Sequence, residues 1–147
     1  MPRSGASAET PRILVVEDDP DIRQLLQDRL PAMGYRVQSA ADGVRALEAV
    51  RAETFEGMIL DIGIPSLDGM DVLRQIRVWD QQIPIVMVTA SGAKELAVRA
   101  IGMGAQAYML KPFDVDELQQ VADYWFRPLE RSSSESVGES STPGSVR

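Results

Sequence analysis

Four short apolar runs in this chain each end at a polar residue. The runs are residues 13–16, 58–60, 85–88 and 108–110, and they lead into Glu17 with Asp18, into Asp61, into Thr89 and into Lys111. Runs of this length are typical of strands that are buried on both faces of a parallel sheet. Because the carboxyl ends of parallel strands share one edge, where open α/β folds bind their ligands, we expect these side chains to converge in one crevice.

The segments between these runs carry apolar residues at helical spacing. We expect helices at 21–30, 43–51, 69–79, 93–102 and 115–129, and a further strand at 35–39. Pro31 should kink or end the first helix. The apolar stripe predicted for the last helix is Val115, Leu118, Val121, Ala122, Trp125 and Leu129. Five alternating strand and helix units with right-handed crossovers predict an α/β fold with a doubly wound parallel sheet, and they are too few for a closed barrel.

Length and composition favour one domain with two tails. Of the 147 residues, 44% are hydrophobic and 25% charged, enough for one core. We expect a domain at 11–131, a disordered arm at 1–10 and a disordered Ser-rich tail at 132–147. No apolar stretch approaches the roughly 20 residues that span a bilayer, so we expect no membrane partner and a cytoplasmic protein.

The amino-acid usage excludes several chemistries. The chain has no Cys and no His, which excludes a thiol nucleophile, a histidine base and an imidazole metal site. Its net charge of -7 and its lack of Lys and Arg clusters argue against nucleic-acid binding. Lysine occurs only at positions 94 and 111, which makes a lysine at a strand end conspicuous.

The acidic residues at the strand ends require a counter-charge. If Glu17, Asp18 and Asp61 lie within about 5 Å, each ionised pair repels by roughly 3 kcal/mol at an effective dielectric near 20. Oxygen ligands without nitrogen or sulfur favour Mg²⁺ as the compensating cation. With Lys111 beside the same carboxylate, Asp61 suits a nucleophile that accepts a phosphoryl group, and Thr89 can supply a hydroxyl to it.

The sequence resembles the receiver domain of bacterial two-component response regulators over about 11–129. The motifs that carry the resemblance are residues 13–20, residues 61–69 with Pro65 and Asp68-Gly69, Val88-Thr89-Ala90, and Lys111-Pro112-Phe113. It implies a flavodoxin-like sheet of five parallel strands in the order 2-1-3-4-5, flanked by five helices. It also implies a phosphorylation-activated switch, with a histidine kinase or phosphotransfer protein as the phosphoryl donor.

The resemblance also assigns residues to roles. It implies that Asp61 is phosphorylated, that Lys111 contacts the phosphoryl group, and that a cis peptide bond precedes Pro112. Thr89 and Tyr108 match the family's switch pair, and the metal ligands for Mg²⁺ or Mn²⁺ are implied to be Glu17, Asp18, Asp61 and the backbone carbonyl of Gly63.

Some of these residues have simpler interpretations. Asp19, beside Pro20, is best explained as a helix cap and is left out of the site. Thr89 and Tyr108 could be ordinary strand residues. We interpret Trp125 as core packing, whereas Tyr124 lies off the apolar stripe and could belong to a partner surface.

The sequence after Leu129 contains no second domain pattern, so we expect output by protein binding from a monomer or weak homodimer, with no enzymatic activity beyond its own phosphorylation and dephosphorylation. The downstream target is unknown. The alternative is a receiver-like scaffold that binds without phosphorylation. A flavin or nucleotide carrier would need a phosphate cradle after the first strand, where the acidic residues would repel it. Gly63 and Ser91 are small, which predicts a short-lived phosphorylated form.

Overall fold

The computed structural model describes residues 10–127, in which five strands alternate with five α-helices. The expected tail and all of the expected arm except Thr10 lie outside these residues. The elements are β1 (Arg12–Val16), α2 (Pro20–Ala32), β2 (Arg36–Ala40), α3 (Gly43–Ala52), β3 (Gly57–Asp61), α4 (Gly69–Trp79), β4 (Ile85–Ala90), the short 3-10 helix η1 (Ser91–Ala93), α5 (Lys94–Gly102), β5 (Ala107–Lys111) and α6 (Val115–Phe126). Within residues 10–127, no helix is both long and apolar enough to cross a membrane.

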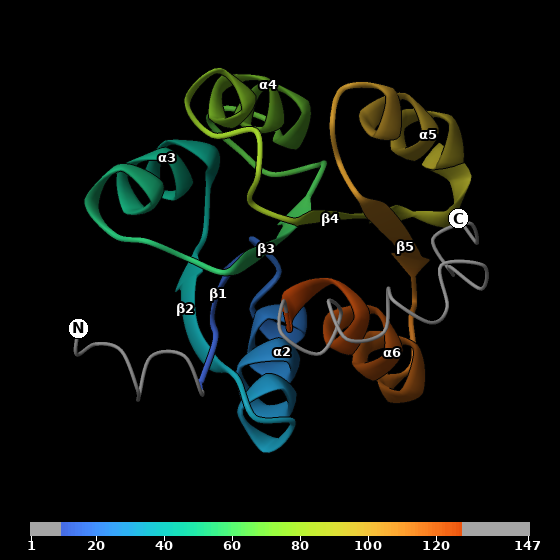
Figure 1. Cartoon of the computed structure of the whole chain (residues 1–147). Helices are drawn as coiled ribbons and strands as arrows, with labels where there is room; N and C mark the ends of the chain where they lie inside the picture. Colours follow the sequence, from blue (N-terminus) through green and yellow to red (C-terminus); the bar gives the residue numbers. More distant parts are fainter. Residues whose placement is uncertain (1–9, 128–147) are drawn as a thin grey trace, which may run out of the picture.

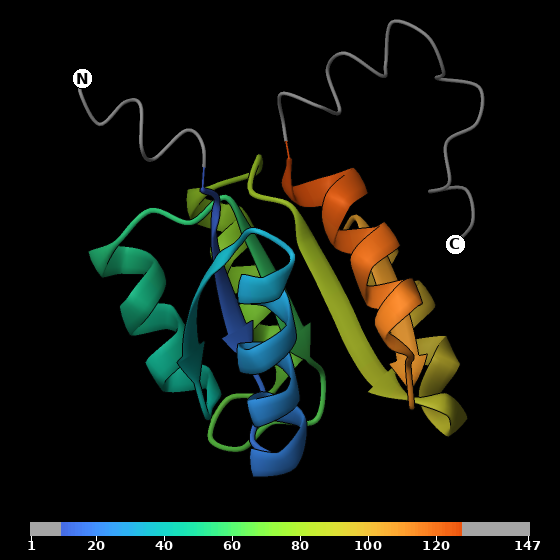
Figure 2. The same ribbon diagram turned by 90° about the horizontal axis from the view of Figure 1, so that it is seen from below.

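The strands form one parallel sheet in the order β2-β1-β3-β4-β5, as predicted. Helices α3, α4 and α5 cover one face of it, and α2 and α6 cover the other (Figure 1). Figure 2 views the face that carries α2 and α6. Each face has its own apolar cluster, because alternate side chains of every strand point to opposite faces. The strands are therefore buried on both sides, which explains their near-continuous apolar runs.

Helix α2 ends one residue beyond Pro31, so the expected end of this helix is nearly correct. Proline removes one amide donor from the last turn. The backbone N–H of Met33 donates to the carbonyls of Arg29 (3.2 Å) and Leu30 (3.0 Å). Gly34 then takes a φ of 101°, a left-handed conformation that suits glycine, and the chain turns into β2.

The aromatic core residue of α6 is Phe126 rather than Trp125. Leu118, Ala122 and Phe126 are buried at a spacing of four residues, whereas Trp125 is half-buried at the edge of the same cluster. The Phe126 ring packs edge-on against Tyr35, with centroids 6.3 Å apart. A Cβ atom at Gly57 would lie 2.2 Å from this ring, so only glycine fits there. Leu129, the last residue of the predicted stripe, lies outside the described residues.

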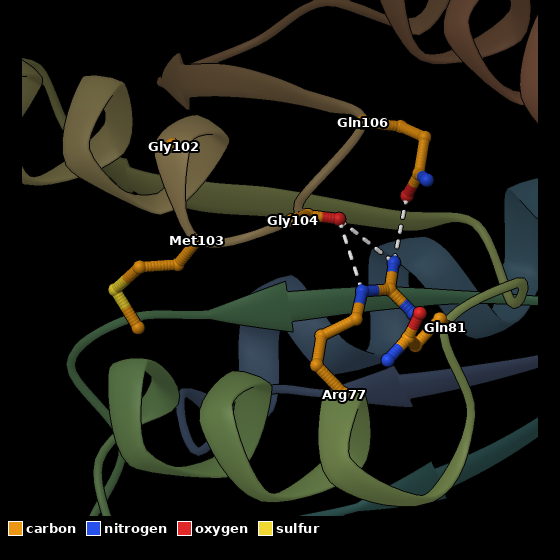
Figure 3. A pocket seen from close by; sticks show the side chains of 6 residues that line it. All are labelled: Arg77, Gln81, Gly102, Met103, Gly104 and Gln106. Atoms are coloured by element: carbon orange, nitrogen blue, oxygen red, sulfur yellow. Dashed lines mark hydrogen bonds between the residues drawn. The ribbon is translucent and has the colours of Figure 1, made fainter.

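A surface pocket of about 500 Å³ lies at the amino-terminal edge of the sheet, opposite the strand ends discussed above (Figure 3). The residues that line it are Arg77, Gln81, Gly102, Met103, Gly104 and Gln106. The Arg77 guanidinium donates from Nε and Nη2 to the Gly104 carbonyl, at 3.0 and 2.9 Å, and from Nη2 to Gln106 Oε1 at 3.0 Å (Figure 3). It also donates to the carbonyls of Asp80 (2.9 Å) and Ile83 (2.7 Å). Arg77 thus ties the end of α4 to the loops before β4 and β5.

We expect Arg77→Met to destabilise the fold by about 2–3 kcal/mol, because it leaves partly buried carbonyls without donors. Arg74→Met is the matched control on the same helix: it removes an exposed ion pair with Asp71 and should change stability by less than about 0.5 kcal/mol. Urea unfolding of both variants tests this. Equal stability of the two variants would contradict the proposed structural role of Arg77.

Candidate functional site

The carboxyl ends of β1, β3 and β5 bring three charged side chains together. Glu17 directly follows β1, Asp61 is the last residue of β3 and Lys111 is the last residue of β5. Each stands two residues beyond a strand residue of the apolar cluster under α2 and α6, namely Val15, Ile59 and Met109. Because side chains alternate along a strand, all three extend on the same side of the sheet.

Lys111 bridges two carboxylates of this group. Its Nζ atom lies 3.1 Å from Asp61 Oδ2 and 3.2 Å from Glu17 Oε1. Carboxylate oxygens of Glu17, Asp18 and Asp61 all lie within 4.8 Å of one another. Pairing of Lys111 with Asp61 was expected from the sequence, but its contact with Glu17 was not, since nothing in the sequence relates these two positions directly.

Burial makes the charge of Glu17 costly. Its side chain is 2% exposed and Asp61 is 6% exposed, whereas Asp18 is exposed to solvent. Burial, and after it the negative charge of Asp61, raises the pKa of Glu17 from 4.5 to about 7. Burial alone would lower the pKa of Lys111, but its hydrogen bond to Asp61 and the charges of Asp61 and Glu17 raise it. Lys111 thus compensates only part of the negative charge of the carboxylates.

This donor set fits a divalent cation. Three carboxylates and one ammonium leave two negative charges uncompensated when all are ionised. The ligands are hard oxygen atoms, which Mg²⁺ and Mn²⁺ prefer. The space beside Gly63 is open, because a Cβ atom added there would have no neighbour within 4 Å. Glu17, Asp18 and Asp61 can therefore hold such an ion, with the Gly63 carbonyl close by in the chain.

The loop between β3 and α4 holds Asp61 in place. The Gly63 backbone N–H donates to Asp61 Oδ1 at 3.1 Å, and that of Gly69 donates to the Ile62 carbonyl at 2.8 Å. A Cβ atom at Gly69 would lie 2.4 Å from the Asp61 carbonyl oxygen. Glycine at this position, expected from the turn before the helix, is thus required by the close approach of α4 to the end of β3.

Thr89 and Tyr108 lie on the opposite side of the sheet from the charged group. Thr89 is 4% exposed and stands two residues beyond Met87, a member of the cluster under α3, α4 and α5. Tyr108 is half-buried, packs against that cluster and is paired with Met87 in the register of β4 and β5. The two side chains therefore share a face on neighbouring strands. The predicted cis peptide bond precedes Pro112.

Two residues beside the acidic group form hydrogen bonds between their side chains and the backbone. Asp19 caps α2, as expected, because its Oδ1 atom accepts hydrogen bonds from Asp21 (2.8 Å) and Ile22 (3.4 Å). Arg23 was missed by sequence reasoning: its Nη1 atom donates to the carbonyls of Glu17 (2.8 Å) and Asp18 (3.2 Å). The available signal was an arginine in the first turns of the helix that follows the acidic pair.

Known proteins resemble this chain over most of its length. The family model of the response regulator receiver domain matches residues 13–123. The transcriptional regulatory protein ZraR of Klebsiella oxytoca is 40% identical over 113 residues, which are 77% of this chain and 26% of ZraR. The response regulator MprA of Mycobacterium ulcerans is 40% identical over 107 residues, which are 73% of this chain and 46% of MprA. The chain thus spans less than half the length of both relatives.

A solved structure with a bound magnesium ion matches the fold of this chain. It is the receiver domain of sensor histidine kinase PA1611 from Pseudomonas aeruginosa, with a magnesium ion coordinated in its active site cleft. That domain is 30% identical to this chain, with a TM-score of 0.73, and the match covers 80% of this chain and 98% of the domain.

The raised pKa of Glu17 predicts a pH-dependent stability in the absence of metal. Between pH 4.5 and about 7 the folded state holds a proton on Glu17 that the unfolded chain releases. The free energy of unfolding should therefore fall as the pH rises through this window, by on the order of 2–3 kcal/mol from this group. Glu17→Gln, which mimics the protonated side chain, should remove that fall.

Urea unfolding in chelator at pH 5 and pH 7.5 measures this difference. Glu48→Gln is the control, because Glu48 is exposed and remote from the acidic group. Parallel pH profiles for the native protein and Glu17→Gln would contradict the prediction.

Proposed function

Because this chain belongs to the response regulator receiver domain family, we propose that Asp61 accepts a phosphoryl group from a partner histidine kinase or phosphotransfer protein. Receiver domains of two-component systems are signalling switches. The observation that carries the proposal is the placement of Asp61: a buried carboxylate within hydrogen-bond distance of Lys111, beside two further carboxylates.

The proposed reaction is a direct phosphoryl transfer. A carboxylate oxygen of Asp61 attacks the phosphorus atom of a phosphohistidine, an oxygen–phosphorus bond forms and the nitrogen–phosphorus bond breaks. The imidazole of the donor leaves with the bonding electron pair. Lys111 keeps its positive charge next to Asp61 and balances the negative charge that the phosphoryl group brings.

Glu17, Asp18, Asp61 and the Gly63 carbonyl would hold Mg²⁺ or Mn²⁺. When bound, the ion would supply positive charge to the phosphoryl oxygens during transfer. The support for this assignment is the all-oxygen donor set and its uncompensated negative charge.

We assign the response to Thr89 and Tyr108. The Thr89 hydroxyl, at the end of β4, would donate a hydrogen bond to a phosphoryl oxygen on Asp61. Tyr108 shares its face of the sheet, so its ring would respond to a shift of β4. The side chains of both residues lie on the face of the sheet that α3, α4 and α5 cover. A surface on that side would then change its affinity for a protein partner.

The phosphoryl acceptor can be identified by intact-mass analysis. We expect incubation with Mg²⁺ and acetyl phosphate to add one phosphoryl group to the native protein and none to Asp61→Asn. Acetyl phosphate replaces the unidentified protein donor. If the native protein gains no phosphoryl group from acetyl phosphate or from any kinase tested, the phosphorylation-independent scaffold becomes the better interpretation.

The openness at Gly63 predicts a short-lived phosphorylated form. We expect Gly63→Met to slow hydrolysis of the acyl phosphate about tenfold or less, because a larger side chain would screen the phosphorus from water. The variant should fold, since a Cβ atom at Gly63 meets no neighbour within 4 Å. Gly102→Met is the control, because its Cβ position is equally open but lies at the opposite edge of the sheet. Equal decay rates for native protein and Gly63→Met would contradict the prediction.

A further inference from the structure

Arg23 connects helix α2 to the backbone that carries two of the acidic side chains. Its Nη1 atom donates to the carbonyl oxygens of both Glu17 and Asp18, at 2.8 and 3.2 Å. Within residues 10–127, Arg23 forms no ion pair with a carboxylate. Its hydrogen bonds therefore act on the backbone of the acidic pair, and its charge is not used to neutralise the side chains directly.

The two acidic residues differ in how firmly they are held. Glu17 is buried, its backbone N–H donates to the Ala40 carbonyl at 3.1 Å, and its Oε2 atom accepts from the Asp19 backbone N–H at 3.1 Å. Its carboxylate also contacts Lys111. Asp18 is exposed, and within residues 10–127 its hydrogen bond is the one that its carbonyl accepts from Arg23. Asp18 thus depends on Arg23 more than Glu17 does.

We propose that Arg23 is a positioning residue for the metal-binding carboxylates, acting mainly through Asp18. The guanidinium links consecutive carbonyls of the loop to the first turns of α2, which orients the Asp18 carboxylate toward Asp61. A divalent cation requires these oxygens at fixed separations. An Asp18 carboxylate that is not held in one orientation therefore binds the cation more weakly, even though no ligand is removed. This inference rests on the proposed function, because it concerns the same site.

The test is the dissociation constant of Mg²⁺ for the unphosphorylated protein, measured by calorimetry. We expect Arg23→Gln to weaken Mg²⁺ binding about tenfold, and Arg23→Lys, whose ammonium keeps a donor and the charge, to recover part of the loss. Arg29→Gln is the matched control: it removes the same charge from an exposed position later in α2. It should bind Mg²⁺ as the native protein does.

Two further measurements separate positioning from general destabilisation. In an Asp18→Asn background, Arg23→Gln should cause little additional loss of Mg²⁺ affinity, because the group that it positions has already been changed. The rate of phosphorylation by acetyl phosphate should fall in Arg23→Gln at low Mg²⁺ and recover at saturating Mg²⁺. Unfolding in chelator confirms that each variant is folded.

The outcomes distinguish this inference from the proposed function. If the native protein neither binds Mg²⁺ nor gains a phosphoryl group, both are overturned. If the native protein does both and Arg23→Gln binds Mg²⁺ within twofold of native, only the positioning role is overturned. Equal losses in the native and Asp18→Asn backgrounds would also overturn it, because they would place the effect outside Asp18.

Discussion

The mutual repulsion of Glu17, Asp18 and Asp61 is the constraint on which the rest of this site depends. Their oxygens lie within 4.8 Å of one another. At that separation each ionised pair costs roughly 3 kcal/mol at an effective dielectric near 20, a large part of a domain's stability. The fold offsets this cost only in part, through Lys111 and through backbone N–H groups that donate to the carboxylates. The remaining negative charge suits the site to a divalent cation, and that cation, together with Lys111, would offset the charge of a phosphoryl group.

The sheet separates the chemistry of the site from its proposed readout. Glu17, Asp61 and Lys111 extend on the side covered by α2 and α6, whereas Thr89 and Tyr108 lie on the side covered by α3, α4 and α5. In the proposed function, a change at the strand ends would reach the second face through Thr89 on β4 and Tyr108 on β5. At the opposite edge the Arg77 guanidinium donates hydrogen bonds to the carbonyls of Ile83 and Gly104, which connects the loops before β4 and β5.

The features that sequence reasoning placed correctly are those governed by local periodicity and chain order. The strand ends at Asp61 and Lys111 follow from short apolar runs, and the cap at Asp19 follows from its position before Pro20. Trp125, predicted to pack in the core, is half-buried against the cluster under α2 and α6, whereas sequence reasoning did not single out Phe126, which is fully buried. Both lie near the same edge of an apolar stripe, and the space left by Gly57 under α6 decides which ring is buried.

The amino-acid sequence by itself determined the order of strands and helices and the kind of functional group at each strand end, because both depend on residue type and spacing along the chain. Only the tertiary structure decided which groups touch. Lys111 contacts Glu17 because the register of the strands places their carboxyl ends at one edge of the sheet. Arg23 donates to two consecutive carbonyls because its side chain is long enough to extend from α2 to the loop after β1. The raised pKa of Glu17 likewise depends on burial and on Asp61, which lies far away in the sequence. Distances and desolvation arise from packing, and local sequence patterns do not encode them.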